Sequence, residues 1–263
     1  MKLKLHHINA FTDTLFTGNY AGVIFLDEWL STALMQAIAT ENNLSETAFV
    51  KQTADNTYQI RWFSPLSEID FCGHATLASA YVLFKQDQAL DDLEFYAKAV
   101  GTLKVRRETD GLIAMTFPRQ MPEPVSDIPP PLLAGLSIAP SEVLINRQAY
   151  FAIYTSETDI HSLKPNLAEL KKLAPYDVVI SAAAHDYDFI SRYFWPASGG
   201  DEDPVTGSIH SGLAPFWAQR LNKTPLTAYQ ASQRGGLLHC RMQTDSVIIS
   251  GRAVQYLEGD IEI

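Results

Sequence analysis

The chain has 263 residues, of which 46% are hydrophobic and 19% charged, as in a soluble globular protein with one large domain or two modest ones. Its 30 acidic and 20 basic side chains give a formal net charge of −10 without any Lys/Arg cluster, which argues against nucleic acids and anionic membranes as partners. No stretch approaches the roughly 20 apolar residues that a membrane span needs.

Strand and helix patterns alternate along the first half. The N-terminus has too few apolar residues for a signal peptide and predicts a strand at 4–11. Ser31 can cap a helix that ends near Asn43, and a second helix at 74–84 follows Gly73. Short apolar runs broken by turn residues predict strands at 22–25, 46–51, 58–63, 93–96, 101–107 and 112–117.

The middle of the chain is rich in proline. Six of the fourteen prolines lie in 118–131, which indicates a linker between domains 1–117 and 118–263, although a proline-rich loop within one domain would give the same pattern. The last strand, near 254–263, can return to the first domain. In the second half we expect a helix at 209–221 and strands at 237–243 and 246–249. Many strands and few helices predict an α+β fold.

An internal echo links the halves. The segment Arg61-Trp-Phe-Ser-Pro65 matches Arg192-Tyr-Phe-Trp-Pro196, at an offset of 131 residues. Acidic residues follow each segment, and then a turn, Cys72-Gly-His74 or Thr206-Gly-Ser208, opens a helix that contains a Leu-Ala pair. The ordered succession of strand, turn and helix predicts a duplicated domain.

Each of these turns places the free backbone N–H groups of a helix N-terminus at the end of a strand. Such a terminus favours anions, and if both pointed into one cleft between the halves they would bind a carboxylate or a developing oxyanion. Ordinary helix caps explain the same residues, and spacing alone leaves both interpretations open. The two cysteines give no disulfide framework and the seven histidines no metal-ligand spacing, so we expect a cytoplasmic protein without a metal.

At these residues the sequence resembles the phenazine-biosynthesis PhzF-like isomerases. The resemblance runs in family order over nearly the whole chain. The matching segments are Phe16–Val23, Asn43–Val50, Arg61–Thr76, Tyr187–Phe194, Glu202–Ser208 and Gln233–Gly236. The resemblance implies a diaminopimelate-epimerase-like fold, in which two similar domains each curl a mostly antiparallel sheet around a central helix. It also implies cofactor-independent relocation of a proton within a small carboxylate substrate, and a homodimer.

Carried over position by position, the resemblance assigns the general acid/base to Glu46. His74, Asp203 and Ser208 match substrate-contacting and proton-relay positions. The remaining matches are Gly73 and Gly207, whose backbone N–H groups would face the substrate, and Asn19, in a loop near the cleft. The residues alone favour a solvated or capping side chain for Glu46 and a capping side chain for His74, whereas Asp203 could complement a helix dipole or orient His74 or a substrate amine.

Some positions depart from the family pattern. Tyr20 replaces the usual proline and Ile209 the usual alanine, which puts the identity of the substrate in doubt. Related racemases exchange a proton between two cysteines, but here that pair matches Cys72 and Thr206. A hydroxyl is too weak an acid to replace the second thiol, so Cys72 is expected to be a small, partly buried residue and not a catalytic base.

Three hypotheses follow. The first is an isomerase that acts on a small cyclic or amino carboxylate through Glu46. The second is a one-base epimerase that depends on Cys72. The third is a small-molecule-binding protein without turnover.

Overall fold

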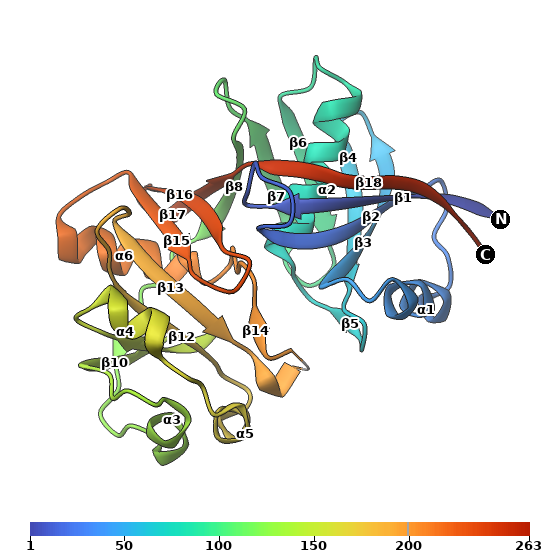
Figure 1. The fold of residues 1–263 in the computed structure, drawn as a ribbon. Coiled ribbons are helices and arrows are strands. Elements are labelled where there is room, and N and C mark those ends of the chain that lie inside the picture. The colour runs from blue at the N-terminus through green and yellow to red at the C-terminus, as the bar shows by residue number, and fades with distance from the viewer. Residues whose placement is uncertain (199) are drawn as a thin grey trace. The chain divides into compact units, whose positions relative to one another are not determined.

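The computed structural model describes residues 1–198 and 200–263. They form two compact units (Figure 1). Unit 1 consists of Met1–Thr116 with Ser250–Ile263, and unit 2 of Phe117–Ile249. No helix in the described part of the chain is long and apolar enough to cross a membrane.

The strands of unit 1 pair in the order β18, β1, β2, β3, β4, β6, β7, β8, with the short β5 beside β4. The pairs β2–β3 and β4–β6 are parallel and the others antiparallel. The strands are β1 (Lys2–Ala10), β2 (Asn19–Leu26), β3 (Glu46–Ala54), β4 (Thr57–Phe63), β5 (Glu68–Ile69), β6 (Asp92–Ala97), β7 (Gly101–Arg107), β8 (Ile113–Pro118) and β18 (Ala253–Glu262).

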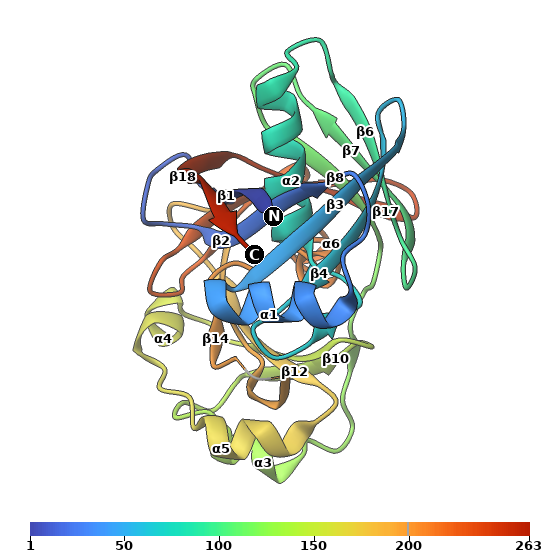
Figure 2. The same cartoon turned by 90° about the vertical axis from the view of Figure 1, so that its right-hand side faces the viewer.

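Two helices complete unit 1, α1 (Thr32–Asn42) and α2 (Gly73–Gln86). Ser31 caps α1 by accepting a hydrogen bond from the backbone N–H of Leu34, and Asn43 ends the helix in the left-handed conformation. Eleven of the fourteen residues of α2 are buried, as expected for a helix surrounded by its sheet. Helix α2 packs against β1, β2 and β3 (Figure 2).

Unit 2 repeats this arrangement. Strands β9, β10, β11, β12, β13, β15 and β16 pair in order, β14 lies beside β13, and the pairs β11–β12 and β13–β15 are parallel. The strands are β9 (Glu123–Pro124), β10 (Glu142–Ile145), β11 (Ala149–Ile153), β12 (Asp177–Ala183), β13 (Phe189–Phe194), β14 (Glu202–Asp203), β15 (Leu226–Gln230), β16 (Gly236–Met242) and β17 (Ser246–Gly251).

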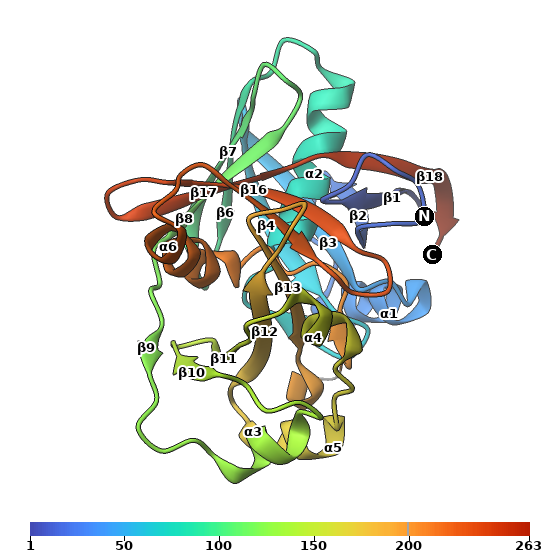
Figure 3. The same cartoon turned by 60° about the vertical axis from the view of Figure 1, so that its left-hand side comes forward.

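The helix of unit 2 that corresponds to α2 is α6 (His210–Leu221), whose first eight residues are buried. Pro215 has no N–H to bond the carbonyl of Ser211, and that carbonyl instead accepts a 3.0 Å hydrogen bond from Gln120 N. The chain between β8 and α6 also holds short helices that the sequence did not reveal, and α3 lies beside α5 (Figure 3). They are α3 (Pro130–Gly135), α4 (Glu157–Ser162), α5 (Leu167–Leu170), η1 (Lys171–Leu173) and η2 (Pro196–Ser198).

The repeated sequence segments make the same side-chain contacts in both units. Arg61 donates two hydrogen bonds of 2.7 Å to Glu68, and Arg192 donates two of 2.8 and 2.9 Å to Glu202. Each guanidinium also lies over the phenylalanine two residues further along its strand, at 5.2 and 5.1 Å from the ring centroid. The α+β fold with two similar halves is therefore confirmed.

Candidate active site

Glu46 is the first residue of β3, directly after the turn that ends α1. In the parallel pairing of β3 with β2 it lies opposite Ala21. Only 4% of Glu46 is exposed, so it is not the solvated surface glutamate that its polar surroundings in the sequence allow. A buried carboxylate requires a charged or hydrogen-bonding partner.

That partner is His74, the second residue of α2. Its Nε2 lies 2.8 Å from Glu46 Oε2, and it is also 4% exposed. His74 does not cap the helix: the N-cap residue is Cys72, which makes no side-chain capping bond. The first N–H groups of α2 therefore have no side-chain cap, as an anion-binding terminus requires.

Asn19, the first residue of β2, holds the other side of the imidazole ring. Its Nδ2 lies 3.1 Å from His74 Nδ1. The preceding Gly18 makes this approach possible, because it has a φ of +70° and a Cβ there would lie 2.3 Å from the carbonyl oxygen of Ala10. The Asn19 amide can serve both forms of His74, since a rotation exchanges its donor and acceptor atoms.

Two neighbours of His74 favour its protonated form. Burial disfavours the charged ring, but the Cys72 sulfur and the Glu46 carboxylate outweigh burial and raise the pKa of His74 well above its usual value. Cys72 lies with Sγ 3.5 Å from His74 Nδ1, yet burial raises the pKa of the thiol to about 11. The thiol is therefore neutral near pH 7.

Glu46, Cys72 and His74 could also hold a metal ion, since one ligand atom from each lies within 4.8 Å of the others. A carboxylate, a thiol and an imidazole form a set that binds zinc, although a cation would have to displace the proton of His74 and ionise a thiol whose pKa is raised to about 11. The histidine spacing in the sequence had not suggested this group.

In unit 2 the structure brings Asp203 and Thr206 together. Thr206 donates a 2.5 Å hydrogen bond from Oγ1 to Asp203 Oδ2. Gln230 fixes both residues, because its Nε2 donates to the Asp203 carbonyl and its Oε1 accepts from Thr206 N, each at 2.8 Å. Asp203 is 8% exposed and therefore belongs to the packed turn before α6.

Gly207 and Ser208 complete this turn. Ser208 does not cap α6 with its side chain: Ser208 Oγ accepts a 2.9 Å hydrogen bond from Gln148 Nε2. The N-cap residue is Ile209, which has no side-chain capping bond, so α6 also begins without a side-chain cap. His210 is fully buried, and its Nδ1 donates a 2.9 Å hydrogen bond to the Thr206 carbonyl.

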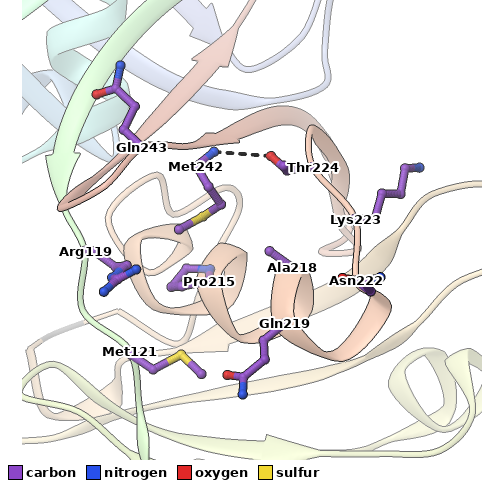
Figure 4. Close-up of a pocket in the computed structure, with 10 residues that line it drawn as sticks. All are labelled: Arg119, Met121, Pro215, Ala218, Gln219, Asn222, Lys223, Thr224, Met242 and Gln243. Atoms are coloured by element: carbon purple, nitrogen blue, oxygen red, sulfur yellow. Dashed lines mark hydrogen bonds between the residues drawn. The ribbon is translucent and has the colours of Figure 1, made fainter.

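The predicted residues therefore gather into two sets, Glu46, His74, Gly73 and Asn19 in unit 1 and Asp203, Gly207 and Ser208 in unit 2. Unit 2 also has a surface hollow that none of them lines (Figure 4). Its lining includes Arg119, Lys223 and Met242 but, among the described residues, no carboxylate, histidine or cysteine, so it lacks the carboxylate acid/base that the resemblance predicts.

A family model described as "Phenazine biosynthesis-like protein" (PhzC-PhzF) matches residues 8–259. The chain belongs to this family. An isomerase of Pseudomonas aeruginosa, described as uncharacterised, is 47% identical over 264 residues, which cover 100% of both chains. Phenazine biosynthesis-like domain-containing protein 1 of Mus musculus is 36% identical, over 99% of each chain.

Solved structures agree with this assignment. The crystal structure of a PhzF-family phenazine biosynthesis protein from Enterococcus faecalis has a TM-score of 0.94 at 39% identity, over 100% of both chains. A hydroxyproline epimerase from Agrobacterium vitis has a TM-score of 0.66 at 10% identity over 99% of this chain and 91% of its own, a likeness of fold alone. As a PhzF-like protein, the chain is an isomerase with an epimerase-like fold, as the sequence predicted.

Proposed function

We propose that this PhzF-like isomerase works without a cofactor, that it relocates a proton on a small cyclic or amino carboxylate, and that Glu46 is its general acid/base. The observation that carries the proposal is the buried 2.8 Å pair of Glu46 Oε2 and His74 Nε2. Apart from this ion pair, the described residues give Oε2 no hydrogen bond of standard geometry, so His74 is the group that orients this oxygen.

The chemistry balances within the substrate. Glu46 takes a proton from a substrate carbon, and the electron pair of the C–H bond moves into a conjugated acceptor group. Glu46 then returns the proton to another atom of the same molecule, so composition and oxidation state do not change. General acid/base catalysis of this kind contributes about 10²–10⁴-fold in rate. Protonated His74 balances the charge of the carboxylate before the transfer.

The other predicted residues are proposed to bind the substrate. His74, Asp203 and Ser208 would contact its polar groups, with Asn19 holding His74 in place. Backbone N–H groups near Gly73 and Gly207 would face a carboxylate, which the uncapped starts of α2 and α6 support. The homodimer and the cytoplasmic location stay predictions.

The test is exchange of substrate hydrogen with deuterated water, followed by NMR over a panel of cyclic and amino carboxylates. Glu46→Gln should fold normally and lose exchange, whereas Glu41→Gln, the same change at an exposed glutamate of α1, should keep it. Exchange that survives in Glu46→Gln would refute the proposed role.

Two further arms separate the alternatives. Dialysis against EDTA should leave exchange intact; loss that zinc restores would instead assign the Glu46–Cys72–His74 group to a metal. Binding of panel members without exchange in the wild-type chain would favour a binding protein without turnover.

A further inference from the structure

Asp177 occupies in unit 2 the position that Glu46 occupies in unit 1. Each is the first residue of its strand. Glu46 lies opposite Ala21 on the parallel neighbour β2, and Asp177 lies opposite Ala149 on the parallel neighbour β11. Asp177 follows Glu46 by 131 residues, the same offset as between the paired arginines of the two units.

A chain of hydrogen bonds connects Asp177 to Ser208. Tyr193, which is 3% exposed, donates from Oη to Asp177 Oδ2 at 2.6 Å. Gln148 Nε2 donates to Tyr193 Oη at 3.0 Å and to Ser208 Oγ at 2.9 Å. In the duplicated turns Ser208 corresponds to His74. In unit 1 the carboxylate of Glu46 contacts His74 directly. In unit 2 the carboxylate of Asp177 is connected to Ser208 through the side chains of Tyr193 and Gln148.

The hydrogen bonds that link Asp177 to Ser208 can run in only one direction. The Gln148 amide nitrogen has two hydrogens, and it uses one on Tyr193 and one on Ser208. An amide nitrogen does not accept, so Tyr193 directs its single hydrogen to Asp177. Ser208 Oγ therefore accepts from Gln148. Among the described residues nothing accepts the hydrogen of the Ser208 hydroxyl. Ser208 is only half-buried, so this hydrogen is available to a ligand.

We propose that Asp177, Tyr193 and Gln148 are positioning residues that hold Ser208 as a hydrogen-bond donor, and that Ser208 binds an acceptor on the substrate, namely a carboxylate oxygen. The inference rests on the proposed function for the role of Ser208, and it extends that function by naming the polar group of the substrate that Ser208 binds. Burial also raises the pKa of Asp177 to about 6, opposed by the Tyr193 hydrogen bond, so the carboxylate that anchors the chain is ionised at pH 7.5.

The experiment measures binding rather than turnover, with the Glu46→Gln variant as the parent protein. The probes are 2-aminobenzoate, cyclohexanecarboxylate and L-proline, each titrated calorimetrically at pH 7.5 beside its primary amide. We expect at least one carboxylate to bind tenfold or more tightly than its amide. If no carboxylate binds more tightly than its amide, the assignment of a carboxylate oxygen as the acceptor for Ser208 is wrong. If carboxylates bind but the wild-type chain exchanges no proton, the function fails while this inference stands.

Gln148→Glu is the decisive variant. A carboxylate at position 148 accepts only, so it would take the hydrogen of Ser208 and weaken carboxylate binding by about tenfold or more. The matched control is Gln219→Glu, the same change at an exposed glutamine of α6, which should bind as the parent does.

Two further positions separate positioning from folding. Tyr193→Phe, which removes only the bridging hydroxyl, should weaken binding several-fold. Asp177→Asn keeps an accepting oxygen and should retain binding within about threefold, whereas Asp177→Val should lose about tenfold. Circular dichroism melts accompany each variant. Unchanged binding in Gln148→Glu and Tyr193→Phe, or losses that only follow the fall in Tm, would overturn the proposal.

Discussion

The Glu46–His74 pair makes a strong prediction about stability. Replacing His74 by glutamine removes the positive charge and leaves the Glu46 carboxylate buried without a counter-ion. Replacing both residues, in Glu46→Gln/His74→Gln, removes both charges and leaves two neutral amides that can bond to each other. The single variant should therefore be much less stable than the double variant, although it carries fewer changes.

The size of the effect follows from the geometry. At 2.8 Å and an effective dielectric constant of about 20, two unit charges attract by about 6 kcal/mol. Desolvation of both groups offsets most of that gain, so the intact pair contributes little net stability. Removing one partner costs about 3–5 kcal/mol, because the other charge stays buried alone. For a chain of this size, that corresponds to a fall in Tm of roughly 6–20 °C.

The assay is urea unfolding monitored by circular dichroism, with all variants at one protein concentration. His161→Gln, at an exposed histidine after the middle of α4, is the matched control and should change stability by less than about 0.5 kcal/mol. The double variant should recover most of the loss. The charged pair would be refuted if His74→Gln were as stable as His161→Gln. It would also be refuted if the double variant lost more free energy of unfolding than His74→Gln alone.

The same experiment has a pH dependence with a definite sign. The pKa of folded His74 is raised above its usual value, so its contribution is complete below about pH 6.5, the unfolded value. It is lost as pH rises through the folded pKa. The stability gap between the wild-type chain and His74→Gln should therefore be widest near pH 6 and narrow toward pH 10; a gap that widens with pH would contradict the assignment.

Two other predictions concern Cys72 and His210. Cys72→Ser should keep proton exchange within about threefold, and iodoacetamide should react slowly at pH 8, because burial raises the pKa of the thiol to about 11; loss of exchange in a folded Cys72→Ser chain would favour the epimerase hypothesis. Burial lowers the pKa of His210 to about 4, so the unfolded chain binds its proton first and up to about 3 kcal/mol of stability is lost as pH falls from 6.5 to 4. The urea midpoint of His210→Gln should fall less over that range than that of the wild-type chain, and equal slopes would count against it.

Local chemistry made much of the fold predictable. The cap at Ser31, the turn at Asn43 and the helix after Cys72 all depend on neighbours within a few residues. The repeat at Arg61 and Arg192 could be seen in the sequence because each arginine bonds to a glutamate only a few residues further along, so that both partners lie within one short segment. The helices α4 and α5, of six and four residues, are too short to show a periodic pattern.

The hydrogen bonds that connect Asp177 to Ser208 in unit 2 were not predicted, for a different reason. Asp177 and Glu46 stand at equivalent places, but the strands that follow them share only apolar character, so no motif marks the match. The one available signal was the offset of 131 residues, applied to Glu46 as well as to Arg61. Tyr193 lies inside the repeated segment, yet its bonds to Asp177 and Gln148 connect β13 with β12 and with the turn between β10 and β11, so they require the strand pairing to be known.

The pairing of β1 with β18 determines when unit 1 can be completed during synthesis. β18 follows the whole of unit 2 in the sequence, while β1 and Glu46 precede it. A ribosome therefore completes unit 2 before it makes the strand that closes unit 1, and until then β1 is an open edge, with Lys2 and Lys4 on it to discourage pairing with other chains. The half that carries Glu46 is the last to be finished, so a chain that terminates before β18 would lack the strand that covers the edge of β1.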